Sequence, residues 1–508
     1  MIAGVPLELP HRVARASDYV VRWVGRQLGR GVEDAHNYGR AVDALFKAAA
    51  VTGADAPAET VQGLRDALLG YTDNPLAMPL ASGEVNPHDL REIIQAFAEL
   101  GFTAGDAEVR DRLGRLLDAM LQITKPDGSW DAAAICSAGL DAPGFRDGES
   151  VEGAAPRVRG RTITALTYLC RLSGDDRALE LAQRFVRLCR TRAFDDDGRL
   201  TVHAGTHTHS ITGTVHGLAD YGVLVGDLDT LEHARRILDR GLAGTCSSFG
   251  WSIETLGDER VPSRGEINNT GDMAQAAILI GLAGYPAYFG RAERMLRSHL
   301  LPSQWLRGQE ILAPADAPEY AVATFPDESD GGWGFPTPSD LHVPDPLFLS
   351  ASILDVTQGG IQVLWSAMSH AATRHGQDTR LNLFLPGSLS AATIEGSLES
   401  PERVAVTLAD RGRLWVRKPG WLEWQQLVLS AGSPAASGPP VAFAQVGEWA
   451  VTEPLAAHTA VAVEVPQVEQ SHEEWIYWQR YRMTFAGDTI VAMEPRGTYA
   501  PMFPPLKE

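Results

Sequence analysis

The 508-residue sequence contains only four cysteines, and none of them forms a CxxC or adjacent-cysteine motif. Neither a zinc knuckle nor a disulfide framework is therefore indicated. The Walker loop, the GxSxG nucleophile elbow, the HExxH motif and the dinucleotide fingerprint are also absent. These absences argue against nucleotide cofactors and against serine-hydrolase chemistry.

Positive charge is also scarce. The 44 lysines and arginines face 64 acidic residues, which gives a formal net charge of −20, and no basic run interrupts this balance. Nucleic acids and anionic membranes are therefore not expected as partners. No apolar run approaches the roughly 20 residues that cross a bilayer, and the N-terminus lacks the order of a secretion signal. We expect a cytoplasmic protein whose ligand is a neutral or cationic small molecule or a sugar, with a homodimer as a candidate assembly.

A helical repeat extends from residue 37 to about 378. Each unit has an apolar helix, a turn rich in Gly and Asp, and a second amphipathic helix. The turn glycines fit the C-terminal end of one helix, and the aspartates that follow suit the start of the next. They are Gly53, Gly105, Gly174, Gly226 and Gly284. A sixth unit ends near Gly376, after an irregular insertion at about 303–355. The pattern predicts an (α/α)6 toroid over residues 1–380, and the irregular spacing argues against the alternative, an open solenoid.

After residue 380 the apolar pattern changes to period two. Short runs rich in β-branched and aromatic residues are separated by Gly, Pro, Asp and Ser. They lie at 380–387, 403–410, 412–421, 423–430, 459–466, 478–487 and 488–495. We predict an antiparallel β-sandwich over residues 381–508. The expected fold class is therefore mainly α with a C-terminal β domain.

Titratable residues gather at two of the predicted helix starts. Four histidines, His203, His207, His209 and His216, lie within fourteen positions. His207 and His209 immediately precede an apolar run, so both are candidates for proton transfer or hydroxyl binding at the mouth of the toroid. A supporting or solvent-exposed position is the alternative for each of them.

The stretch RGEINNTGDMAQAA, residues 264–277, contains the second cluster. Glu266 precedes an apolar helix and follows Glu254 by twelve positions. Two carboxyl groups are what glycoside cleavage needs, one to protonate the leaving oxygen and one to attack the anomeric carbon or activate water. The alternatives are a solvated loop acid for Glu254 and a helix-start anion for Glu266. Asn269 or Thr270 is the expected N-cap of this helix.

The insertion contains the sequence DGGWGF, residues 330–335. Trp333 lies between glycines there, and two interpretations remain open. Its indole stacks on a sugar face at the rim of the funnel, or it attaches the loop to the toroid.

Four segments, taken in order, resemble the β-L-arabinofuranosidases of glycoside hydrolase family 127 (GH127). They are residues 207–239, 249–257, 265–284 and 288–304. In addition, LWVRKPGW at 414–421 resembles a sandwich strand of that family. The resemblance implies that His207 is an active-site histidine, Glu254 the general acid/base and Glu266 a zinc ligand. A zinc-binding cysteine of the family falls on Asn268. The later cysteine pair falls within 354–365, where this sequence has no cysteine. Since neither Asn nor Asp replaces a zinc thiolate, we expect no zinc site and no other cofactor.

These observations predict a glycoside hydrolase for a small or terminal glycoside, such as an L-arabinofuranoside, that uses carboxylates in place of the zinc thiolate. Glu254 is expected to be the acid, with Glu266 or Asp355 as base or nucleophile. The alternatives are a non-catalytic carbohydrate-binding protein and a toroid-fold polysaccharide lyase or sugar epimerase. The residues expected to contact the substrate are His207, His209, Asn268, Asn269, Trp333, Arg161 and Asp355.

Overall fold

A computed structural model describes residues 8–32, 34–81, 84–139, 155–257, 264–312, 328–341, 352–387, 389, 391–398, 402–433 and 438–506. Residues 313–327 and 342–351, which make up much of the predicted insertion, lie outside this set. No helix in the described ranges is long and apolar enough to cross a membrane.

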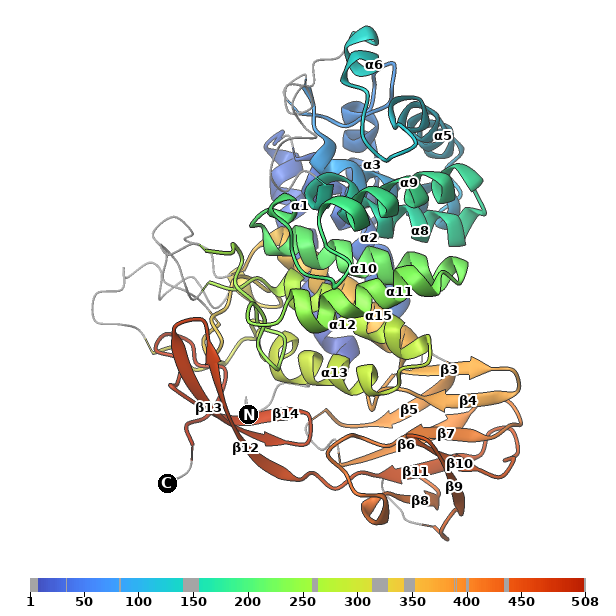
Figure 1. Cartoon of the computed structure of the whole chain (residues 1–508), viewed down its shortest axis with the longest axis vertical. Helices are drawn as coiled ribbons and strands as arrows, with labels where there is room; N and C mark the ends of the chain where they lie inside the picture. The colour runs from blue at the N-terminus through green and yellow to red at the C-terminus, as the bar shows by residue number, and fades with distance from the viewer. Residues whose placement is uncertain are drawn as a thin grey trace.

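Six helices form a closed inner ring, in which each helix packs against the next and the last packs against the first (Figure 1). The predicted (α/α)6 toroid is therefore confirmed. The inner helices are α2 (Ala35–Thr52), α4 (Leu90–Ala98), α8 (Arg161–Ser173), α10 (Thr208–Val225), α12 (Ile267–Leu282) and α15 (Leu354–His370).

An outer layer of helices covers this ring. Five of them follow an inner helix along the chain, as the repeat predicts. They are α3 (Ala58–Tyr71), α5 (Ala107–Ile123), α9 (Asp176–Arg192), α11 (Leu228–Arg236) and α13 (Ala287–Met295).

The turns between inner and outer helices are built as predicted. Gly174 and Gly226 end their helices at φ of 70° and 71°, which a side chain would disfavour, and Asp175 and Asp227 cap the helices that follow.

The sixth outer helix is α1 (Leu9–Gly29), which packs against α15 and α2. The prediction of a second helix ending near Gly376 is wrong, because the chain forms strands β3 (Ala372–His375) and β4 (Asp378–Leu381) there. The N-terminal helix has a clear signal in the sequence, with Pro10 in its first turn and buried Leu9, Val13 and Val20 along one face. The ring is thus closed by chain segments from its two ends.

Two sheets form the β-sandwich, and the first, of order β3-β4-β7-β10-β9, begins directly after α15. The second sheet has the order β5-β6-β11-β8. Every pair in these sheets is antiparallel except β4 with β7, which is parallel. The remaining strands are β5 (Ala392–Gly396), β6 (Arg403–Leu408), β7 (Leu414–Arg417), β8 (Val428–Ala431), β9 (Phe443–Val446), β10 (Trp449–Thr452) and β11 (Ala460–Glu464).

A third sheet, β12-β13-β14, is antiparallel and separate from the sandwich (Figure 1). Its strands are β12 (Glu469–Ile476), β13 (Gln479–Ala486) and β14 (Thr489–Glu494). Ile476, Met483 and Phe485 pack in one apolar cluster with Phe249 and Trp251 of the toroid. Residues 381–508 are therefore not a sandwich throughout, because the chain returns to the helical domain after β11.

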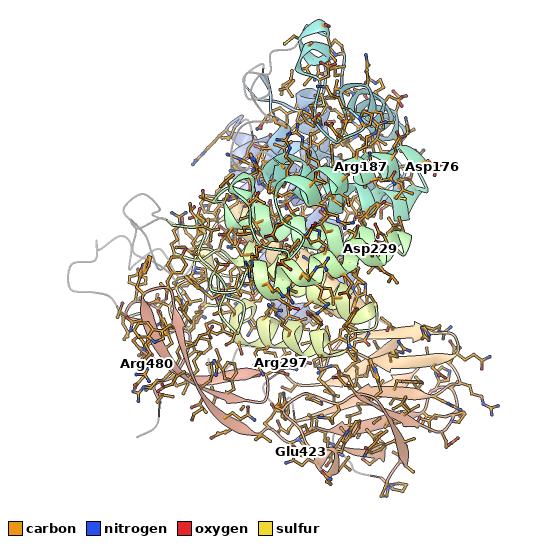
Figure 2. The ribbon with its side chains drawn as sticks, viewed as in Figure 1. Asp176, Arg187, Asp229, Arg297, Glu423 and Arg480 are labelled. Atoms are coloured by element: carbon orange, nitrogen blue, oxygen red, sulfur yellow. The ribbon has the colours of Figure 1, made fainter. Side chains whose placement is uncertain are left out.

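Charged residues join the toroid to the sandwich. Glu293 of α13 binds Arg417 of β7 at 2.6 Å and Arg297 at 2.9 Å. Arg297, labelled in Figure 2 at this junction, also donates to the carbonyl oxygen of Phe384 at 2.5 Å. All three charged side chains are buried, so loss of one would leave an unpaired buried charge.

The inner helices approach closely at glycines, which gives a test of the ring. A Cβ atom on Gly39 of α2 would lie 2.7 Å from the backbone of Glu92 in α4. We expect Gly39→Ala to lower the free energy of unfolding by about 1–3 kcal/mol, because the two helices must move apart. The matched control is Gly25→Ala in α1, where a Cβ meets nothing within 4 Å and helix propensity favours alanine by about 1 kcal/mol. Denaturant unfolding of both variants measures the difference; equal stabilities would contradict the close packing.

Candidate active site

The six inner helices start at the same end of the toroid, so residues near their N-termini converge. His36 lies in the first turn of α2, Arg161 is the first residue of α8, and Asp355 lies in the first turn of α15. His207 and Glu266 immediately precede α10 and α12. The toroid thus brings together residues that are more than 300 positions apart in the sequence.

Glu254 reaches this group on an extended segment. Its carbonyl oxygen accepts a hydrogen bond from Thr208 N at 3.0 Å, and its own N–H donates to Arg264 O at 2.9 Å. The segment therefore lies between the chain that leads into α10 and the chain that leads into α12. Its carboxylate is partly exposed and pairs with Arg264 at 2.8 Å. This backbone pairing brings Glu254 close enough for its charge to act on Glu266.

Glu266 is almost completely buried. Its Oε1 accepts a hydrogen bond from Asn268 Nδ2 at 2.7 Å and lies 3.1 Å from His209 Nδ1. Its Oε2 lies 4.0 Å from His207 Nε2. Burial, together with the charges of Asp355 and Glu254, raises the pKa of Glu266 to about 8. This carboxyl group therefore holds a proton at neutral pH.

The start of α12 differs from the prediction. Glu266 itself is the N-cap residue, and its side chain makes no capping hydrogen bond. The expectation of Asn269 or Thr270 as N-cap is wrong, because the helix already begins at Ile267. The Glu266 side chain is directed to the site and not to the helix backbone.

Asp355 has the opposite protonation state. Its Oδ1 lies 2.5 Å from Arg40 Nη1 and 3.0 Å from His36 Nε2, and Asn268 Nδ2 donates to Oδ2 at 3.2 Å. Burial alone would raise the pKa of Asp355, but Arg40 and His36 outweigh it and hold this pKa well below its ordinary value. Asn268 thus bridges a protonated carboxyl group and an ionised one.

A second buried anion, Glu92 of α4, organises the cations around it. Its Oε1 lies 2.7 Å from Arg91 Nε and 3.1 Å from Arg161 Nη2. Arg161 Nη1 also lies 2.5 Å from His88 Nε2. Burial alone would lower the pKa of His36, but Glu92 and Asp355 raise it to about 10. His36 is therefore a cation at neutral pH.

Both histidines predicted from the sequence reach the site. Burial and the charge of Arg161 lower the pKa of His207 to about 4 and that of His209 well below its ordinary value. Both are therefore neutral at physiological pH. His207 is partly exposed, whereas His209 is buried between Glu266 and Asp272, whose Oδ2 lies 3.5 Å from His209 Nε2.

Two residues expected to contact a substrate do not face the open side of the site. Trp333 is fully buried, and its Nε1 donates to Leu300 O at 2.8 Å. The stacking interpretation of Trp333 is therefore wrong, and its role is to attach the loop to the toroid. Asn269 is also fully buried, and its Nδ2 donates to Ile253 O at 3.3 Å. It supports the segment that carries Glu254.

Several residues of the site were not predicted from the sequence. They are His36, Arg40, His88, Arg91 and Glu92. The signal was of the same kind as at His207, since AHNYGR and PHDLRE place polar residues at the starts of apolar helices. Their importance comes from contacts across the ring, which the sequence does not display.

The residues at the positions where the resemblance places zinc ligands do not fit a thiolate zinc centre. Asn268 Oδ1 accepts a hydrogen bond from Arg40 Nη2 at 3.0 Å, and the same guanidinium pairs with Asp355. A cationic side chain therefore already occupies the space between the two positions. Among the described residues, His36, His88 and Asp89 form the one group close enough to share an ion. Arg161 donates to His88, so a further cation is disfavoured there as well.

No protein-family model matches the sequence, and a search of curated proteins finds no match. Solved structures do match. A GH127 β-L-arabinofuranosidase from Geobacillus stearothermophilus T6 aligns with a TM-score of 0.60 at 11% identity, over 94% of this chain and 84% of that one. Another GH127 β-arabinofuranosidase aligns with a TM-score of 0.60 at 13% identity, over 89% and 74%. The fold is that of the GH127 arabinofuranosidases.

A third structure, described as a glycoside hydrolase, aligns with a TM-score of 0.57 at 13% identity, over 93% of this chain and 80% of that one. At identities this low, structural similarity shows a shared fold but gives no information about the chemistry of the site. The GH127 fold supplies the helix starts on which the site is built. The roles of the side chains in this site depend on their own geometry.

The buried carboxyl group of Glu266 predicts a pH-dependent stability. Because its folded pKa lies above its unfolded value, the folded state binds the extra proton and loses stability as the pH rises from about 4.5 to about 8. We expect Glu266→Gln to remove this loss, which amounts to about 1.4 kcal/mol per pH unit crossed. Denaturant unfolding between pH 5 and 9 measures it. The control is Glu59→Gln at an exposed position, and parallel pH curves for wild type and Glu266→Gln would contradict the assignment.

Proposed function

We propose that this protein is a glycoside hydrolase that cleaves a small or terminal glycoside with a carboxyl pair, Glu254 and Glu266. The observation that carries the proposal is that these two carboxyl groups, brought together by the segments leading into α10 and α12, have different partners. Glu266 is buried and holds a proton, whereas Glu254 pairs with Arg264. Glycoside cleavage uses one carboxyl group of each kind.

The roles differ from those expected from the sequence. A general acid must carry a proton at the working pH, and the environment of Glu266 provides this. We therefore assign the acid role to Glu266, through its Oε2, since Oε1 is engaged by Asn268 and His209. Glu254, which pairs with Arg264, takes the other role and acts on the anomeric carbon or on the attacking water.

Asp355 is better suited to position the substrate than to react with it. Arg40, His36 and Asn268 all contact its carboxylate, so its lone pairs are largely used. Partly exposed His207, at the start of α10, offers a neutral imidazole to a sugar hydroxyl. An L-arabinofuranoside is the substrate suggested by the sequence resemblance and by the GH127 fold.

Hydrolysis requires no metal in this proposal. Arg40 supplies the positive charge beside Asn268 and Asp355, and the carboxyl pair supplies the proton and the base. The proposed reaction therefore differs from zinc-thiolate chemistry in its nucleophile and in its pH dependence.

The first test of the proposal is activity. On whichever aryl furanoside or pyranoside the wild type cleaves, we expect Glu254→Gln and Glu266→Gln each to lower kcat by about 10²–10⁴-fold, because each removes one half of the acid/base pair. His203→Ala, at an exposed position before α10, is the control and should keep wild-type activity.

Several outcomes would refute the assignment. Full activity in both glutamine variants would exclude the carboxyl pair. Sugar binding without turnover across the panel would indicate a carbohydrate-binding protein. An unsaturated product that absorbs ultraviolet light would indicate a lyase, and a product of unchanged mass an epimerase.

The second test is metal removal. Because Arg40 stands between Asn268 and Asp355, we expect dialysis against a chelator to leave kcat/KM unchanged and elemental analysis to find no stoichiometric zinc. Adding zinc to the dialysed protein is the control and should give no increase. Activity that is lost on chelation and restored by zinc would contradict the proposal.

A further inference from the structure

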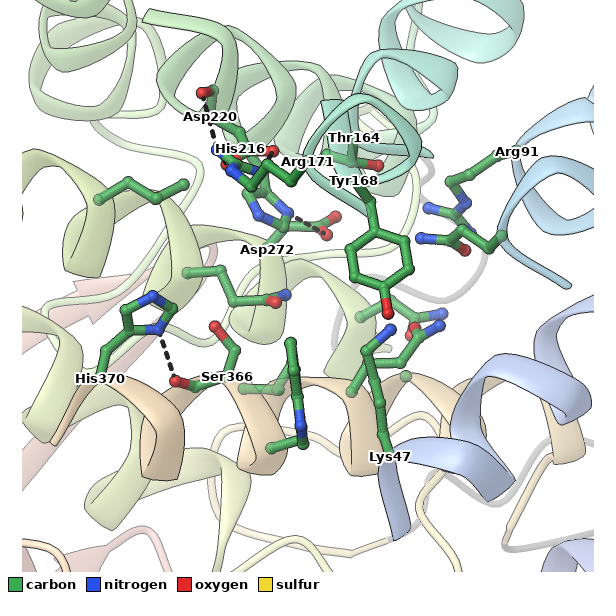
Figure 3. A pocket seen from close by; sticks show the side chains of 18 of the residues that line it. Lys47, Arg91, Thr164, Tyr168, Arg171, His216, Asp220, Asp272, Ser366 and His370 are labelled. Carbon is green, nitrogen blue, oxygen red and sulfur yellow. Dashed lines mark hydrogen bonds and ion pairs between the residues drawn. The ribbon is translucent and has the colours of Figure 1, made fainter. Parts of the chain in front are cut away.

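A cavity of about 400 Å³ lies inside the ring between the C-terminal halves of the inner helices (Figure 3). This volume is typical of small-molecule sites. Its walls include Arg171 near the end of α8 and His370 at the end of α15, far along these helices from Arg161 and Asp355. Arg40, Arg91, Asn268 and Asp272 form its inner boundary with the candidate active site.

The cations that line this cavity are paired within the protein. Arg171 forms a two-pronged pair with Asp220 at 2.6 and 2.9 Å, and Lys47 pairs with Asp43. Arg40 and Arg91 pair with carboxylates on the active-site side. Every cation in the wall therefore has a carboxylate partner, and none is left to compensate an anionic ligand.

Asp272, on the acidic side of the cavity, accepts a hydrogen bond from Thr212 Oγ1 at 3.0 Å, and imidazole nitrogens of His209 and His216 lie 3.5 and 3.8 Å from its oxygens. Arg40 also contributes its charge near Asp272. Since the cations of the wall are already paired, an anionic ligand gains no ion pair here, and a neutral molecule suits the cavity.

Unused hydrogen-bonding groups face this space. Gln95 Oε1 is buried and has no partner among the described residues. The His370 Nδ1–H donates to the carbonyl oxygen of Ser366 at 2.8 Å, since a carbonyl can only accept, and neutral His370 therefore offers Nε2 as an acceptor. Figure 3 shows His370 and Ser366 across the cavity from His216 and Arg171. Hydroxyl groups, which both donate and accept, suit such a set.

Apolar and aromatic side chains complete the wall. Leu172, Val223, Leu279, Leu282 and Val363 line one part of the cavity. Elsewhere, Lys47 Nζ lies 4.7 Å from the ring centre of Tyr168 and 5.0 Å from that of Trp365, which holds both rings in place. A wall of fixed polar groups beside apolar surface suits a molecule with hydroxyl groups on its edges and C–H groups on its faces.

We propose that this cavity is a second ligand site that binds a neutral polyhydroxylated molecule of monosaccharide size. The proposal does not depend on the hydrolase activity of the first site. The residues of this site lie on the C-terminal halves of the inner helices. The charged residues around Arg40 and Arg91 separate them from Glu254 and Glu266.

The test is calorimetric titration with free D-galactose and D-xylose, with D-galacturonate as the charged counterpart of galactose, followed by a crystal soak. We expect the neutral sugars to bind more tightly than galacturonate. Gln275→Trp fills the cavity from α12 and should abolish binding, whereas Leu228→Trp, at an exposed position of α11, should not change it. Glu254→Gln should also bind normally, which separates this site from the first.

A second variant distinguishes a loss of sugar binding from a loss of folding. Gln95→Leu removes the unpartnered buried oxygen, so we expect unchanged or higher stability together with sugar binding at least about tenfold weaker. No heat with either neutral sugar would overturn the proposal. So would affinity that survives Gln275→Trp, tighter binding of galacturonate, or a soaked sugar found only beside Glu254.

Discussion

The position of one guanidinium group determines much of this structure. Arg40 of α2 is buried and binds Asp355 and Gln362 of α15 and Asn268 of α12. It therefore connects three inner helices where the end of the helical chain meets its beginning. A Cβ atom on Gly359 would lie 2.5 Å from this guanidinium and 2.0 Å from Asn268 Oδ1, so only glycine leaves room for the contact. The same interaction helps to close the ring and shapes the floor of the site.

The electrostatic character of the site follows from that contact. Buried charges are costly unless they are paired, and Arg40 pairs with Asp355 in preference to Glu266. Asp355 therefore stays ionised, and its charge in turn makes ionisation of Glu266 less favourable. His36, held between Glu92 and Asp355, stays protonated for the same reason. Protonation states in the centre are thus set by the partners of each group and not by residue type.

Local features of the fold were predictable from the sequence, and contacts between distant segments were not. Gly174, Asp175, Gly226 and Asp227 identify their turns because the helix ends depend on nearby residues alone. The closure of the ring by α1 and the return of β12–β14 to the toroid depend on segments hundreds of residues apart. The burial of Trp333 belongs to the same class, since its partner is the carbonyl oxygen of Leu300.

The candidate site likewise has features that the sequence predicts and features that it does not. Both Glu254 and Glu266 could be predicted as candidate site residues, because each lies in a Gly-containing segment that carries titratable groups. Their roles could not, because these depend on Arg264, Asp355 and the depth of burial.

The candidate site differs from a thiolate zinc centre in the position of its charges as well as in its lack of cysteines. A metal ion between positions 268 and 355 and the guanidinium of Arg40 would place two cations in contact, and each would weaken the binding of the other. We therefore expect that a metal ion and the Arg40 guanidinium do not occupy this place together. With Arg40 in place, Asn268 is the better residue there, since its amide accepts from the guanidinium and donates to both carboxyl groups. Asn268, Gly359 and Arg40 thus form one interdependent unit, and the carboxyl chemistry proposed for Glu254 and Glu266 is the chemistry that this unit allows.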